Sequence, residues 1–153
     1  MLIKYAKLIR LAGFLIAAVA FALPAVKGAD AGPGSGPYSG WLCAVTAASA
    51  TGGLIRSGLN LGNDALGSLC LVLSGWVNPL VVMYLLFLLG ARFVVVRRVV
   101  AAGILACLIA TWVFLVKAPM IPLVGHFLWV GGIFLMLAPE FFMLFRNKAT
   151  ADE

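Results

Sequence analysis

The sequence predicts an all-α integral membrane protein, a small bundle of four transmembrane helices. Three long segments, residues 65–91, 99–116 and 118–139, contain no Asp, Glu, Lys or Arg. A hydrocarbon core about 30 Å thick needs roughly 20 apolar residues in a helix, and each segment is close to that length or longer. Because 64% of the 153 residues are hydrophobic and only 10% are charged, we expect a single membrane domain over residues 1–153 and no soluble domain.

The first predicted span, about residues 9–26, has two interpretations. A basic start, an apolar stretch and Pro24 fit a membrane anchor, but they also fit a secretory signal peptide with Ala29-Asp30-Ala31 as its cleavage site. An anchor gives a bundle of four spans. A cleaved signal leaves three.

The glycine-rich segment 27–65 is predicted to be an external loop. Its start, residues 32–37, alternates Gly with Pro and Ser, which is typical of an irregular linker. Apolar residues then recur at helical spacing from Trp41 to Leu59, which indicates a helix lying on the periplasmic membrane surface. Gly52-Gly53 weakens this helix, so two short helical pieces or a packed loop are the alternatives.

The second span, about residues 66–90, carries polar residues on one side. Cys70, Ser74 and Asn78 recur every four residues, so they share one helix face, which we expect to turn toward the bundle rather than toward lipid. Pro79 has no backbone N–H to donate, which predicts a kink beside Asn78.

The third and fourth spans, about residues 99–116 and 119–145, contain small residues at spacings that let helix backbones approach closely. These predicted helix-packing positions are Ala102, Ala106 and Ala110 in the third span, and Gly125 and Gly132 in the fourth.

The distribution of basic residues predicts the orientation. Eight of the eleven Lys and Arg residues lie before the first apolar run, which begins at Leu11, between the second and third spans, or after the fourth. Basic residues are enriched in short cytoplasmic segments, so we expect both termini to be cytoplasmic in a bacterial inner membrane. Because these charges cluster at span ends rather than on one basic face, we expect no nucleic-acid partner.

Three polar residues inside the predicted spans are the candidate functional residues: Asn78, His126 and Glu140. Polar and ionisable groups in a span are costly and often mark a pathway. His126 and Glu140 share one helix face but lie about 21 Å apart along it, so they cannot touch. The structural alternatives are that both reach the interface or a nearby arginine such as Arg146, and that Asn78 hydrogen-bonds a neighbouring helix.

The remaining chemistry-bearing residues are few. Cys43 and Cys70 both lie toward the predicted periplasmic side, where a disulfide can form, and the alternative is three buried, inert thiols. The chain lacks CxxC, HExxH and Walker A motifs, so we expect no catalytic residues and no enzymatic activity. One histidine and three scattered cysteines do not predict a metal site, and we expect no cofactor.

Two functions follow as expectations. The leading one is a non-enzymatic subunit or assembly partner of a membrane complex, because small-residue faces offer helix contacts while the loops are short and poor in charge. Its partners are the lipid bilayer and other membrane protein chains, or further copies of this chain. The alternative is a homo-oligomeric channel or transporter, with the polar intramembrane residues lining the pathway.

Overall fold

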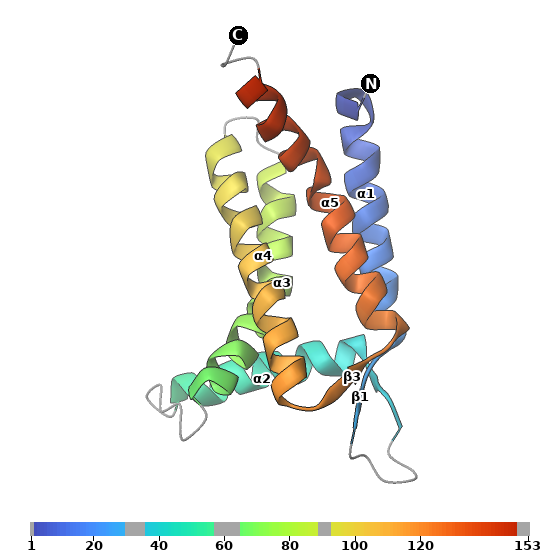
Figure 1. Ribbon diagram of the computed structural model, residues 1–153, viewed down its shortest axis with the longest axis vertical. Coiled ribbons are helices and arrows are strands. Elements are labelled where there is room, and N and C mark those ends of the chain that lie inside the picture. Colours follow the sequence, from blue (N-terminus) through green and yellow to red (C-terminus); the bar gives the residue numbers. More distant parts are fainter. Residues whose placement is uncertain (1, 30–35, 57–64, 89–92, 150–153) are drawn as a thin grey trace.

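The protein, seen in a computed structural model, is mostly helical with one small antiparallel sheet (Figure 1). The structure describes residues 2–29, 36–56, 65–88 and 93–149. The elements in chain order are α1 (Leu2–Ala20), β1 (Pro24–Gly28), β2 (Tyr38–Ser39), α2 (Gly40–Arg56), α3 (Ala65–Leu88), α4 (Val94–Lys117), β3 (Met120–Pro122) and α5 (Val124–Ala149).

The long helices form two antiparallel pairs. α1 packs along α5, and α3 packs along α4, while α2 lies across one end of the bundle next to the sheet (Figure 1). We call this end the α2 end, and we call the opposite end, where α1 begins and α5 finishes, the terminal end. The core that joins the two pairs is apolar and includes the completely buried Val77, Ile104 and Leu137, one each from α3, α4 and α5.

Three of these helices are long and apolar enough to cross a membrane, namely Ala65–Leu88, Val94–Lys117 and Val124–Phe142. This confirms the sequence-based expectation of three long apolar helices in a helical bundle. α1 does not meet the same standard, because Lys4, Lys7 and Arg10 occupy its first half.

The first predicted span ends earlier than expected. α1 finishes at Ala20, and the amides of Phe21, Ala22 and Leu23 then donate to carbonyls three residues back, which tightens the last turn. Pro24 does not continue the helix and starts a strand instead. Residues 24–26, predicted as the end of the first span, and residues 27–28, predicted as the start of the external loop, therefore belong to β1.

The sheet, which the sequence analysis did not predict, has the strand order β2-β1-β3. Val26 pairs with Tyr38 on one side and with Pro122 on the other. Its prolines occupy permitted places, because Pro24 is the first residue of its strand and Pro122 lies on an edge strand. Residues 120–122 are therefore strand rather than the start of the fourth span, and α5 begins at Val124.

The two helices of the α1–α5 pair touch through glycine. A Cβ atom on Gly132 would lie 2.6 Å from the carbonyl oxygen of Gly13 and 2.6 Å from the backbone nitrogen of Ala17. Gly125 is similarly close to a backbone, that of Leu23 and Pro24. Gly132 thus packs against a helix as expected, whereas Gly125 packs against the segment that enters β1.

The predicted surface helix forms as one continuous helix, α2, despite Gly52-Gly53. It contacts α3 closely, since a Cβ on Gly75 would lie 3.0 Å from the carbonyl oxygen of Ala47. Residues 32–35 of the predicted linker 32–37 lie outside the described residues, as do residues 57–64 of the predicted loop.

Candidate functional site

A cavity of about 370 Å³ lies at the α2 end, between α2, the sheet and the nearby ends of α3, α4 and α5. Most of its wall is apolar. The polar members of the wall include Asn78, His126, Ser74 and Thr111, which come from α3, α4 and α5. Two of the three candidate residues from the sequence, Asn78 and His126, are thereby brought to one cavity, and Glu140 is not.

His126 is the most buried polar residue of this cavity, with only 5% of its surface exposed. It stands in the first turn of α5, where its ring contacts Trp112 of α4 at 5.1 Å and Trp129 of α5 at 5.7 Å between ring centres. These aromatic rings cover part of the imidazole. Its Nε2 atom is buried and has no hydrogen-bond partner among the described residues.

Three other polar groups of the cavity, those of Asn78, Ser74 and Thr111, have partners within the chain. The indole N–H of Trp129 donates to Oδ1 of Asn78 at 3.3 Å, which links α5 to α3 next to Pro79. The hydroxyls of Ser74 and Thr111 donate to carbonyls of their own helices, those of Leu71 and Cys107. Ser74 and Asn78 line the cavity, so this part of the predicted polar stripe does face the bundle.

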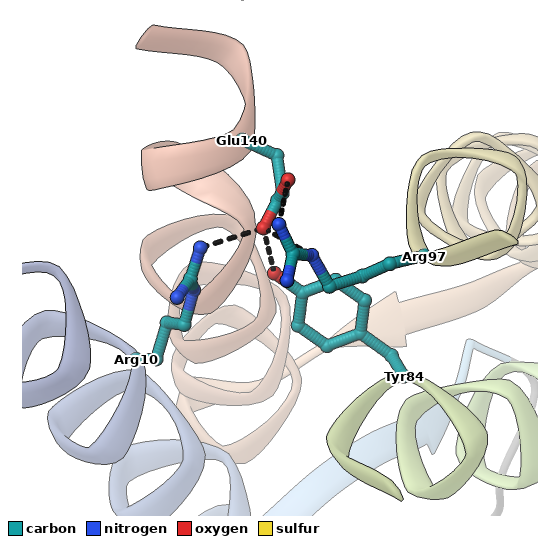
Figure 2. A network of polar contacts seen from close by, with 4 residues as sticks. All are labelled: Arg10, Tyr84, Arg97 and Glu140. Carbon is teal, nitrogen blue, oxygen red and sulfur yellow. Dashed lines mark hydrogen bonds and ion pairs between the residues drawn. The ribbon is translucent and has the colours of Figure 1, made fainter. Parts of the chain in front are cut away.

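A second polar cluster surrounds Glu140 (Figure 2). Glu140 lies in the second half of α5, the half that leads to the terminal end. Nη2 of Arg10 donates to Oε1 of Glu140 at 2.6 Å, and the hydroxyl of Tyr84 donates to the same oxygen at 3.1 Å. Nη2 of Arg97 donates to Oε2 at 3.2 Å. Nε of Arg97 also lies 2.8 Å from Oε1, an ion-pair contact whose N–H is not aligned for a hydrogen bond.

The Glu140 cluster joins all four long helices. Arg10 comes from α1, Tyr84 from α3, Arg97 from α4 and Glu140 from α5. The side chains are deeply buried, with exposed fractions of 12% for Arg10, 11% for Arg97 and 2% for Glu140. Two guanidiniums face one carboxylate, so Glu140 holds the two helix pairs together electrostatically.

Sequence reasoning located Glu140 but missed its partners. It expected a nearby arginine such as Arg146, whose side chain lies outside the described part of the chain. The partners are Arg10 and Arg97, more than forty residues away in sequence. The carboxylate itself was a signal for these partners, because a buried negative charge requires a positive charge nearby.

Cys43, Cys70 and Cys107 are free thiols, which agrees with the alternative of unpaired cysteines rather than with a Cys43–Cys70 disulfide. Cys43 lies on the face of α2 that lines the cavity, while α2 and α3 are in close contact at Ala47 and Gly75. Burial raises the pKa of the Cys43 thiol, although a backbone hydrogen bond opposes the shift. This keeps the thiol protonated and slows its reaction with oxidants or alkylating agents.

The predicted small-residue stripe of α4 is divided between two environments. Ala110 is buried, whereas Ala102 and Ala106 are exposed on the outside of the bundle. The inward face of α4 carries Val100, Ile104 and Leu108 instead. Any close helix contact at Ala106 must therefore involve another chain.

No three His, Cys, Asp or Glu side chains are grouped to hold a metal ion within the described residues. Comparisons with protein-family models, with curated protein sequences and with solved structures found no match.

Proposed function

We propose that this chain is a multi-pass protein of the bacterial inner membrane that acts as a non-enzymatic subunit or assembly partner of a membrane complex. This proposal rests on the outer face of α4. Ala102 and Ala106 are exposed there beside the large apolar residues Val95, Val99 and Ile109. In a membrane, a face of small residues lets a second helix approach closely and gain dispersion contacts.

The arrangement of charge supports cytoplasmic termini. α1 and α4 both begin at the terminal end (Figure 1), and Arg10 lies in the first half of α1 while Arg97 lies near the start of α4. Lys27 and Arg56 belong to β1 and α2, at the other end. The positive-inside bias then puts the terminal end in the cytoplasm and the α2 end in the periplasm.

The contacts of α1 support its retention as a fourth membrane segment. Gly13 lies in backbone contact with Gly132, and Arg10 is paired with the buried Glu140. Cleavage of a signal peptide near Ala31 would remove both contacts and expose a face of α5 that is built for close packing. The intact chain therefore fits the fold better than the cleaved one.

Substitution of Ala106 by Leu tests the subunit proposal. The added bulk should prevent close approach of a partner helix, so the tagged chain purified from its native membranes in mild detergent should lose a co-purifying protein about tenfold or more. Ala12→Leu is the matched control, because Ala12 is also exposed but lies on α1. Equal co-purification with both variants, or none with the unaltered chain, would contradict the proposal.

A homo-oligomeric channel or transporter is the second proposal. The observation that favours it is the shared cavity of Asn78 and His126, two of the residues expected to line a pathway. The structure gives Glu140 a different environment, between two arginines. Flux into liposomes that is lost in both Asn78→Ala and His126→Ala would support this function, and absent or unaltered flux would count against it.

A further inference from the structure

The cavity at the α2 end has the properties of a ligand site that the proposed subunit function does not use. Its volume of about 370 Å³ falls within the range of roughly 300–1,000 Å³ that is common for small-molecule pockets. One wall belongs to α2, with Cys43 and Ala47, and the opposite walls belong to the α2 ends of α3, α4 and α5. The cavity therefore lies where the bilayer meets water if α2 follows the membrane surface.

The lining excludes a charged ligand. No Asp, Glu, Lys or Arg is present among the described residues that line the cavity. Moving a charged headgroup into such a wall would strip its hydration without a counter-charge to replace it. Apolar side chains such as Leu71, Phe114 and Leu115 instead suit a hydrocarbon chain or ring system.

The lining also favours one polar group on the ligand. Nε2 of His126 is buried without a hydrogen-bond partner, and a buried polar atom that lacks one is costly. The carboxamide of Asn78 lies on the same cavity, with its oxygen already used by Trp129. An amide N–H group and an imidazole nitrogen together suit an oxygen atom that accepts a hydrogen bond, and a hydroxyl can also donate one.

We propose that this cavity binds a neutral amphiphile, an apolar chain or ring system with a hydroxyl or carbonyl oxygen that hydrogen-bonds to His126 and Asn78. The ligand partitions into the bilayer first and enters beneath α2 with its oxygen held beside α5. This proposal is independent of the subunit function, since it rests on the cavity and not on the outer face of α4.

The test is photolabelling of the purified full chain in phosphatidylcholine vesicles. One probe is a long-chain alcohol with a diazirine in its chain, and its control is the same chain without the hydroxyl. Tandem mass spectrometry then maps the labelled residues. We expect the alcohol to label the cavity wall at least about fivefold more strongly than the hydrocarbon, since each net hydrogen bond contributes a ratio of about five, and excess unlabelled alcohol to remove this labelling.

Two variants and one control sharpen the result. His126→Phe keeps an aromatic ring but removes the nitrogen, so the preference of the wall for the alcohol over the hydrocarbon should fall to what Asn78 alone provides. Ala47→Phe fills the cavity and should reduce labelling by both. Phe134→Leu, on an exposed part of α5, should change neither.

Either of two results with the unaltered chain would overturn the proposal, whether or not the variants fold. The first is labelling of the wall that excess alcohol does not compete away. The second is equal labelling by alcohol and hydrocarbon, which would mean that the cavity takes a lipid tail without recognising an oxygen.

Discussion

Replacement of Glu140 by Gln should destabilise the protein by about 3–5 kcal/mol, the usual cost of leaving buried charges without their partner. The carboxylate is the only acidic group that contacts Arg10 and Arg97 among the described residues, and both guanidiniums are nearly buried. Gln keeps the size of the side chain but leaves two positive charges facing each other. The free energy of unfolding in mixed detergent micelles measures this loss.

The two-to-one ratio of arginine to glutamate predicts an order among variants. Arg10→Met leaves a neutral pair of Arg97 and Glu140, so it should cost clearly less than Glu140→Gln. Tyr84→Phe removes one hydrogen bond to the carboxylate and should cost about 1 kcal/mol. If Arg10→Met lowers the free energy of unfolding as much as Glu140→Gln does, the charge imbalance does not determine the stability of this cluster.

Replacement of Gly132 by Ala is the second change with a large expected effect. The new Cβ would lie 2.6 Å from backbone atoms of Gly13 and Ala17. Neither partner atom is at the end of a flexible side chain, so α1 and α5 must move apart. We expect a loss of about 1–3 kcal/mol, as for other overpacked sites, measured by the same unfolding assay.

Gly131 provides a matched control one residue away. A Cβ there meets nothing within 4 Å, so the effect of Gly131→Ala on stability should come only from the higher helix propensity of alanine. It should stabilise the protein by about 0.5–1 kcal/mol. Equal effects of the two substitutions would mean that α1 does not lie against α5 at Gly132.

The long helices were predictable from the sequence because their signal is continuous. Hydrophobic residues without charge over 18 or more positions have few structural alternatives, and the structure contains three such helices. α2 was also visible, in the helical spacing of its apolar residues. The sheet was not, because its strands are 5, 2 and 3 residues long and contain Pro24 and Pro122.

The sequence identified the polar residues of the candidate site, but it did not identify the groups that they contact. Asn78, His126 and Glu140 stand out because polar groups in apolar helices are rare. Which groups they meet depends on how α1 and α4 are placed around α5, and spacing along one helix carries no such information. For the same reason, the positions of Cys43 and Cys70 in the sequence did not reveal that α2 meets α3 at Ala47 instead.

Native mass spectrometry of the chain, extracted from its own membranes under mild conditions, tests the central proposal most directly. It reports the mass of the chain and of every species bound to it. Our account predicts an uncleaved chain, because α1 is packed against α5, bound to a different membrane protein in fixed stoichiometry. A chain that starts near Ala31, or one found only alone or with copies of itself, would contradict the account.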